Sequence, residues 1–153
     1  SMAKIDRFRS VRYGQLLTAD KKEIYLTLAI STDEQAKGLS GKRAQEFGDD
    51  EGMFFYFPSE GTRGFWMPDT YFNLDIFYLD DQLKVIAVDR NMQAHPGMHE
   101  PIPRGREIIC RHVLELKSTS HIAKNIKEGD LLVWKGDLTW PSVEKNIKAQ
   151  DLQ

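Results

Sequence analysis

Gly52-Met53-Phe54-Phe55-Tyr56-Phe57 is the stretch that decides the fold, because six small or apolar residues follow one another without a polar interruption. A run this short and this rich in aromatic side chains is typical of a β-strand that is buried on both faces. Pro58 and Gly61 mark the loop that follows it. The parity of the run pairs Phe55 with Phe57, and Phe54 with Tyr56, on opposite faces of the strand.

Strand patterns recur on both sides of this run. Residues 23–30 alternate apolar and polar side chains, which predicts a half-buried strand. Residues 74–79 and 83–88 flank the polar turn 80–82 and predict a β-hairpin. Shorter or later runs also have strand character: 65–67, 108–116 and 131–134.

Helices are predicted to be few and short. Ser31 and the acidic residues after it favour a helix that ends near Gly38, and a second helix is predicted over 118–126. Pro141 suits the first turn of a terminal helix that ends near Ala149. Residues 91–107 carry three prolines and two glycines and predict an extended loop. The predicted fold class is α+β, mainly β: a small, partly closed β-barrel with two or three short helices.

Composition sets limits on function. The 153 residues are 41% hydrophobic and 29% charged, with a formal net charge of −2, which argues against a nucleic-acid binder. No apolar run approaches the ~20 residues needed to cross a bilayer, and no signal segment is visible. Ser1-Met2 resembles the remnant of a cleaved tag, so a cytoplasmic protein and an exported protein whose leader was removed are both compatible with the sequence. Oligomeric state is not predicted.

An ordered series of motifs resembles the family known as domain of unknown function 192. The series comprises Gly38-Leu39, residues 50–57, Phe65-Trp66-Met67-Pro68-Asp69-Thr70, residues 74–77, residues 112–116 and Gly129-Asp130. The resemblance implies a compact bacterial or archaeal β-barrel domain, often exported, with no assigned activity. It divides the chain into an N-terminal extension and possible first strand (1–22), the family-like domain (23–135) and a C-terminal extension with a short helix (136–153). Asp69 stands where the family usually has Asn.

The segment from Trp66 to Thr70 is the leading candidate for a ligand site. A large aromatic ring, the carboxylate of Asp69 and the hydroxyl of Thr70 together suit a small polar ligand or a glycan, with Asp75 close by in sequence. The predicted ligand-binding residues are Trp66, Met67, Asp69, Thr70, Asp75 and Arg63. In the alternative interpretation, Trp66 is a core anchor while the polar residues stabilise a turn or cap backbone amides.

Basic residues near this segment favour an anionic ligand. Arg104, Arg106 and Arg111 flank the long loop and its strand, and Arg63 precedes the tryptophan motif. If the loop folds over Trp66, these residues form a cationic rim on an aromatic floor. The alternative is a solvated rim whose partners are Glu100 and Glu107.

Histidines and the single cysteine are weaker candidates. His95, His99, Cys110 and His112 fall within 18 positions, but the first two lie in a Pro/Gly loop without a helix to align them, so no metal site is predicted. Cys110 and His112 would point to the same side of one strand, where burial is the expected fate of the cysteine. No cofactor is predicted, because the sequence lacks glycine-rich phosphate loops, Gly-x-Ser-x-Gly and Cys-x-x-Cys.

Three functional hypotheses follow. The favoured one is a domain that binds a small molecule or glycan at the Trp-Met-Pro-Asp-Thr segment. The second is a hydrolase that uses the carboxylates of Asp69 and Asp75, for which one of the two should lie in a cleft with a perturbed pKa. The third is a structural or protein-interaction module that binds through an exposed strand edge or apolar patch.

Overall fold

The computed structural model describes residues 11–151. Residues 1–10 of the predicted N-terminal extension and residues 152–153 of the predicted C-terminal extension lie outside the described residues. Seven strands form the larger sheet: β1 (Tyr13–Leu17), β2 (Glu23–Ala29), β3 (Glu51–Phe55), β5 (Leu74–Leu79), β6 (Val85–Met92), β8 (His112–Lys117) and β9 (Val133–Trp134). β4 (Gly61–Trp66) and β7 (Arg104–Cys110) form a separate antiparallel pair. The helices are α2 (Thr32–Lys37), α3 (His121–Lys124) and α4 (Trp140–Asp151), with a 3₁₀ turn at Ala44–Glu46.

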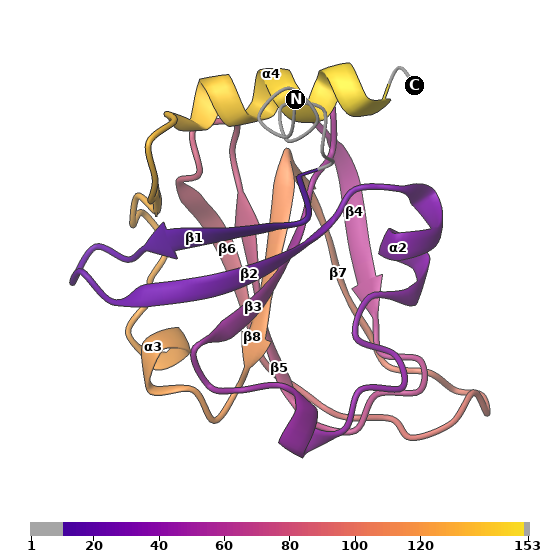
Figure 1. Ribbon diagram of the computed structural model, residues 1–153. Coiled ribbons are helices and arrows are strands. Elements are labelled where there is room, and N and C mark those ends of the chain that lie inside the picture. Colours follow the sequence, from indigo (N-terminus) through magenta and orange to yellow (C-terminus); the bar gives the residue numbers. More distant parts are fainter. Residues whose placement is uncertain (1–10, 152–153) are drawn as a thin grey trace.

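The larger sheet has the strand order β6-β5-β8-β3-β2-β1-β9 and curls around itself (Figure 1). β2 and β3 are parallel, joined by a connection that contains α2, and their register places Leu28 beside Phe54. The other pairings are antiparallel. This architecture confirms the predicted mainly-β, partly closed fold with a few short helices.

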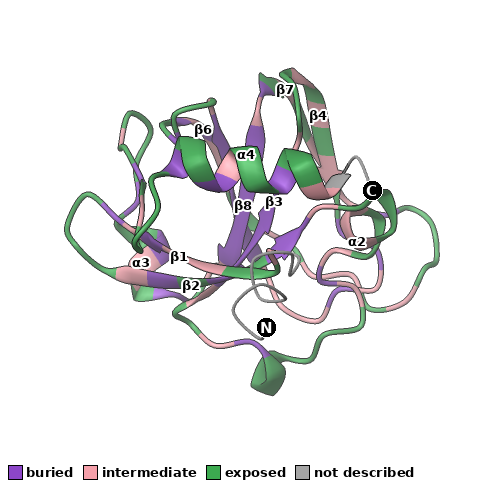
Figure 2. Cartoon of the chain, turned by 45° about the horizontal axis from the view of Figure 1, so that its top comes forward, coloured by how far each residue is buried: buried purple, intermediate pink, exposed green. Residues whose placement is uncertain are grey.

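One face of the sheet packs against α3 and α4, and we call it the helix face. Its buried side chains include Leu28, Phe54 and Leu114 from the sheet. Trp140 and Ile147 of α4 join the same cluster, and in Figure 2 the outer surface of this helix is exposed. The aromatic run of β3 therefore has a full hydrophobic cover on this side.

We call the opposite face the hairpin face, after the antiparallel pair β4–β7 that covers it and not after the β5–β6 hairpin of the sheet itself. The segment that follows α2 also packs against this face. Phe55, Ile76 and Val113 of the sheet are buried here with Leu39 and Met67. Every residue from Gly52 to Tyr56 is buried, which confirms the predicted strand that is covered on both faces. The predicted hairpin is also confirmed, since β5 and β6 pair around residues 80–84.

The predicted single strand 108–116 is wrong, because the chain breaks at Arg111. The backbone N–H of Arg111 donates to the carbonyl of Leu79 (2.9 Å), and its Nε donates to the carbonyl of Phe57 (2.6 Å). These bonds turn the chain from the β4–β7 pair into the larger sheet. Consequently Cys110 belongs to the hairpin face and His112 to the helix face, not to one side of one strand.

Other element boundaries shift in the same region and at the helices. The predicted loop 91–107 is shorter, because β6 continues to Met92 and β7 begins at Arg104. The predicted helix 118–126 contracts to α3, where the Ser120 side chain accepts a hydrogen bond from the backbone N–H of Ala123 (3.1 Å) and caps the helix. The predicted terminal helix is present as α4, with Pro141 in its first turn.

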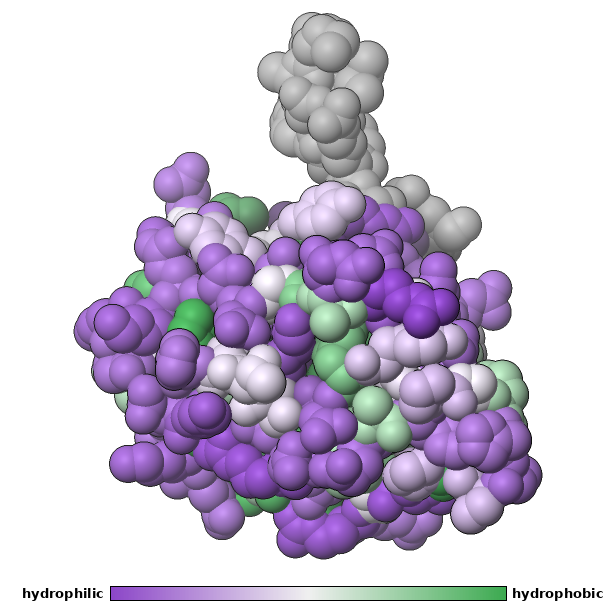
Figure 3. Space-filling model, turned by 90° about the horizontal axis from the view of Figure 1, so that it is seen from below, coloured by the Kyte–Doolittle hydropathy of each residue, from purple (hydrophilic) through white to green (hydrophobic). Residues whose placement is uncertain are grey.

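The surface seen from below is mainly hydrophilic, with a small group of apolar residues near the middle of the view (Figure 3). Across residues 11–151, no helix combines the length and the apolar character required to span a membrane.

Candidate functional site

Helix α2 is fixed to the end of the sheet by its own sequence. Ser31 and Glu34 form a capping box: the Ser31 hydroxyl accepts from the Glu34 N–H (3.1 Å), and Glu34 Oε1 accepts from the Ser31 N–H (2.9 Å). The Gln35 side chain then donates to the carbonyls of Ala29 (3.2 Å) and Tyr56 (2.5 Å). Because those carbonyls end β2 and begin the loop after β3, α2 is held against the rim of the hairpin face.

The chain leaves α2 through a close approach to the sheet. Gly38 has φ +49°, and a Cβ built on it would lie 3.3 Å from the ring of Phe55, so a larger residue would be strained and crowded. Two residues later the Ser40 hydroxyl donates to the carbonyl of Pro68 (2.6 Å). This bond ties the segment after α2 to the tryptophan motif that follows β4.

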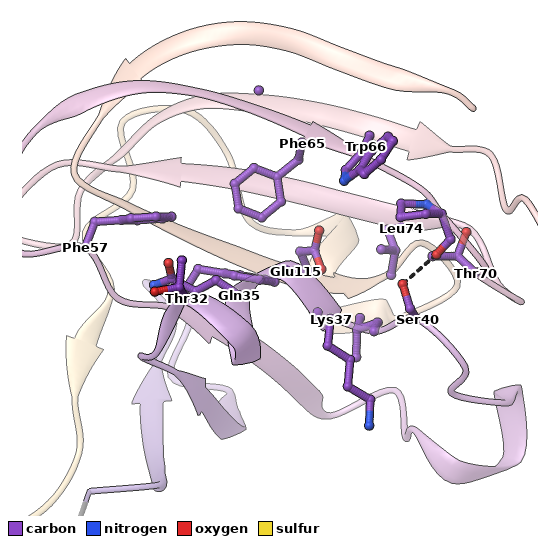
Figure 4. Close-up of a pocket in the computed structure, with 16 residues that line it drawn as sticks. Thr32, Gln35, Lys37, Ser40, Phe57, Phe65, Trp66, Thr70, Leu74 and Glu115 are labelled. Atoms are coloured by element: carbon purple, nitrogen blue, oxygen red, sulfur yellow. Dashed lines mark hydrogen bonds between the residues drawn. The ribbon is translucent and has the colours of Figure 1, made fainter. Parts of the chain in front are cut away.

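A pocket of about 310 Å³ lies between α2 and β4, with the sheet as its floor (Figure 4). Four aromatic side chains line it, and the rings of Phe55 and Phe65 meet edge to face with centroids 4.7 Å apart. The lining residues that the argument uses are Lys37, Phe55, Phe57, Phe65, Trp66 and Glu115. The volume lies at the lower end of the range for small-molecule sites.

Two rings of the pocket wall also stack with arginines. The guanidinium of Arg63 lies 3.8 Å from the ring centroid of Phe57, and that of Arg104 lies 4.8 Å from the ring centroid of Trp66. Trp66 is 39% exposed, so it is an accessible wall of the site and not a core anchor. The stacked arginines restrict the positions of both rings.

The floor of the pocket carries a buried carboxyl group that the functional prediction did not include. Glu115 of β8 is 3% exposed and is paired in register with Met53 and Ile76, both apolar residues of the hairpin face. Burial raises its pKa to about 8. Within residues 11–151 no side chain or backbone N–H donates a hydrogen bond to this carboxyl group, and no cation pairs with it. The sequence signal was the single acidic residue within the apolar run Val113-Leu114-Glu115-Leu116.

The structure brings only part of the predicted site to the pocket. Trp66 and Thr70 line it, whereas Met67 is fully buried in the core of the hairpin face. The Thr70 hydroxyl donates to the carbonyl of Met67 (2.9 Å) and accepts from the backbone N–H of His95 (3.0 Å). Thr70 therefore joins the tryptophan motif to the loop after β6.

Asp69 does not line the pocket but connects neighbouring loops. Its Oδ1 accepts from the Tyr71 hydroxyl (2.5 Å) and from the backbone N–H of Gly97 (3.0 Å). The hydrogen bond from Tyr71, and to a smaller extent the one from Gly97, lowers the pKa of Asp69. Asp69 also has φ +49°, a backbone conformation that Asn and Asp tolerate better than most residues.

Asp75 lies on the other side of the sheet. It follows the parity of Phe77 and Leu79, which belong to the helix face. Its Oδ2 accepts from Arg90 (2.9 Å) and its Oδ1 accepts from the backbone N–H of Asn91 (2.8 Å). Trp66 and Asp75 are therefore not brought together.

The predicted cationic rim is only partly present, since Arg63 and Arg104 stack on rings of the pocket wall while the other two arginines are paired elsewhere. Arg106 forms an ion pair with Asp89 (2.8 Å), and Arg111 forms one with Glu144 of α4. None of these arginines, nor Arg63 or Arg104, lines the pocket.

The histidines and the cysteine lie elsewhere. The rings of His95 and His99 are 4.2 Å apart in the loop after β6, and His112 is buried on the helix face. Burial raises the pKa of the Cys110 thiol to about 11, which suppresses the thiolate form. Over residues 11–151, no three His, Cys, Asp or Glu side chains are arranged to hold a metal ion.

Solved structures from two bacteria share this fold. A protein of Sinorhizobium meliloti, described as a proposed transcription regulator, superposes with a TM-score of 0.64 at 26% identity and covers 80% of this chain and 92% of its own. A protein of unknown function from Novosphingobium aromaticivorans gives a TM-score of 0.63 at 28% identity, covering 80% of this chain and 84% of its own. A comparison with curated proteins finds no match.

The curled sheet with helices on one face and a strand pair on the other defines a small mainly-β domain that is shared with bacterial proteins. The model of DUF192, a family described as "Uncharacterized ACR", matches residues 15–134. The chain belongs to this family. The match begins within β1 and ends at the last residue of β9, so α4 lies beyond it.

Proposed function

We propose that this domain binds a small organic molecule in the pocket between α2 and β4. The observation that carries the proposal is Glu115, a carboxyl group in the floor of an aromatic pocket that no described group pairs. Among the described residues, the sealed side-chain atoms without a hydrogen-bond partner are Arg63 Nε and His112 Nε2, and neither Glu115 oxygen is one of them. The Glu115 carboxyl group is therefore open to the pocket, where its surroundings are apolar and a bound group can reach it. A bound ligand supplies the missing partner and the apolar contacts together.

The pocket has the composition that ligand sites share. Its walls are mostly apolar and aromatic, and a single ionisable group lies among them with a raised pKa. The neighbouring segments are fixed by Gln35, Ser40 and Thr70 through hydrogen bonds to backbone atoms. The pocket is therefore formed before the ligand arrives, which reduces the entropy lost on binding.

A hydrolase that uses Asp69 and Asp75 together is less well supported. Asp69 lies in a loop outside the pocket, whereas Asp75 lies on the helix face and is bonded to Arg90. A reaction that requires both carboxylates in one cleft would need a different arrangement of the sheet.

The test is a binding screen monitored by nuclear magnetic resonance, in which backbone amide shifts report the place of binding. Ligands of the pocket should shift the amides of Gly38, Gly64 and Thr70, and Trp66→Ala should weaken their binding about tenfold or more, because it removes one wall. Trp66 is 39% exposed, so we expect this variant to fold.

Tyr13→Ala is the matched control, since it removes an aromatic ring that is 76% exposed on β1, outside the pocket. Ligand affinity should be the same in this variant as in the wild type. Ligands whose shifts map to other surfaces, or that bind Trp66→Ala as tightly as the wild type, would contradict the proposal.

A further inference from the structure

The chemistry of the pocket favours one sign of ligand charge. The faces of aromatic rings carry partial negative charge, and Phe57, Phe65 and Trp66 lie around Glu115 (Figure 4). Arg63 stacks on one face of Phe57 and Arg104 on one face of Trp66, which leaves the other ring faces for a ligand. Once Glu115 is ionised, its carboxylate at the floor adds to that potential. Rings and carboxylate together attract a cation and repel an anion.

The basic side chains near Glu115 are directed elsewhere. Lys37 lines the pocket, but Figure 4 shows its side chain pointing away from Glu115. Lys117, two residues along β8 on the same face, donates to the carbonyls of Ala44 (3.0 Å) and Phe47 (3.0 Å). No lysine or arginine of residues 11–151 forms an ion pair with Glu115.

The strands beside Glu115 bring no cation either. β3 places Met53 next to it, and β5 places Ile76 there. Tyr78, the next residue of β5 on this face, donates its hydroxyl hydrogen to Asp89 (2.9 Å). The acid therefore has neither a cationic partner nor a donor within the described fold.

We propose that the pocket recognises an organic ammonium ion, whose N–H groups donate to the Glu115 carboxylate and whose apolar body packs on Phe57, Phe65 and Trp66. This inference rests on the proposed ligand-binding function and names its ligand class. A carboxylate that is buried alone in apolar surroundings is unfavourable. A positive group beside it compensates for the lost hydration. The predicted anionic ligand relied on four arginines, none of which lines the pocket. Arg63 and Arg104 stack on rings of the pocket wall, whereas Arg106 and Arg111 form ion pairs with acids.

Binding is coupled to the loss of a proton. Burial raises the pKa of Glu115 to about 8, so the free protein holds the carboxyl group mainly in its neutral form at pH 7. The ammonium ion arrives already protonated and favours the carboxylate. Glu115 therefore releases its proton to solvent, and the ammonium keeps its own.

Three probes of similar shape and different charge test the inference: 2-phenylethylamine, 2-phenylethanol and 3-phenylpropionate. Calorimetric titration of the full chain should show that the amine binds about tenfold or more tightly than either other probe. At pH 7, titrations in two buffers of different ionisation enthalpy should show release of nearly one proton for each amine bound.

Glu115→Gln should weaken amine binding about tenfold or more while it leaves 2-phenylethanol affinity nearly unchanged. Asp75→Asn is the matched control, because it changes a buried acid on the opposite face and should leave amine affinity unchanged. Circular dichroism checks that both variants fold.

The outcomes separate the two proposals. Binding of the alcohol or the propionate as tightly as the amine, at the pocket amides, would overturn the ammonium inference and leave the pocket as a ligand site. Binding of the amine without proton release, or equally to Glu115→Gln, would also overturn it. If none of the three probes binds the wild-type protein at millimolar concentration, both the pocket proposal and the ligand class are contradicted.

Discussion

The two faces of the sheet bury ionisable side chains of β8 in different surroundings. On the helix face, His112 packs against the rings of Phe54, Tyr56 and Trp140, with centroids 5.0–5.4 Å apart. On the hairpin face, Glu115 lies at the floor of a pocket. Both pKa values are shifted toward the neutral form, to about 2 for His112 and about 8 for Glu115, mainly by burial.

The difference lies in what surrounds each group. His112 Nδ1 accepts from the backbone N–H of Phe57 (3.3 Å), which places the proton of the neutral ring on Nε2. Nε2 has no hydrogen-bond partner in the described chain, and the His112 ring meets the Trp140 ring at 88°. The helix face thus encloses its ionisable group among protein rings, whereas the hairpin face leaves its group beside space that a ligand can occupy. The first arrangement serves packing, and the second is suited to binding.

The largest expected effect is a loss of stability on the helix face. Phe54 is fully buried there, so Phe54→Ala should lower the free energy of unfolding by about 3–5 kcal/mol. Phe57→Ala should cost less than half as much, because Phe57 is half-buried and borders the pocket, where water can replace the ring. Chemical denaturation of both variants measures the difference.

Equal losses for Phe54→Ala and Phe57→Ala would contradict this contrast between a closed face and an open one. Trp134 and Trp140 provide a fluorescence signal from the helix face in both variants.

The second effect is a pH dependence that belongs to the hairpin face. The pKa of Glu115 is raised from 4.5 in the unfolded chain to about 8 in the folded protein. Between these values the folded state holds a proton that the unfolded state has lost, so rising pH favours unfolding. The stabilising contribution is fully present below about pH 4.5 and is lost as the pH rises to about 8.

Glu115→Gln removes this contribution, so its stability relative to wild type should improve as the pH rises from 5 to 8. The change is at most about 1.4 kcal/mol for each pH unit, and less where water reaches the carboxyl group. Denaturation curves recorded across that range measure it. His112 titrates in the opposite sense below pH 6.5 in both proteins and cancels in the comparison. Parallel pH profiles for the two proteins would show that Glu115 is not buried as described.

Local patterns predicted the strands well, because the residues that define both faces of β3 and the alternation of β2 follow one another in the sequence. The aromatic run, the β5–β6 hairpin and the capped α2 each depend on neighbours in sequence. The break at Arg111 was missed, since it depends on bonds to Leu79 and Phe57, which lie far away in the chain.

The candidate site also combines residues that a local motif reveals with residues that only long-range strand pairing brings together. Trp66 and Thr70 were identified because they share one short motif that also lies at the pocket. Asp75 was grouped with them by closeness in sequence, although strand parity and the sheet separate the two. Glu115 joins Trp66 only through the pairing of β8 with β3 and β5, which no local pattern reveals.

The smallest expected effect sharpens the assignment of Asp75 to the helix face. Asp75→Asn keeps the shape of the side chain but weakens its bonds to Arg90 and to the N–H of Asn91, so stability should fall by about 1 kcal/mol. Arg90 is 40% exposed, which keeps the ion-pair contribution small. The affinity for 2-phenylethylamine should not change, because the sheet lies between Asp75 and the pocket. If Asp75 contacts the ligand, as the sequence predicted, the opposite result is expected. The substitution should then weaken the binding free energy of 2-phenylethylamine by more than it lowers the free energy of unfolding. A measurement of both quantities on one variant therefore decides whether the two faces act independently.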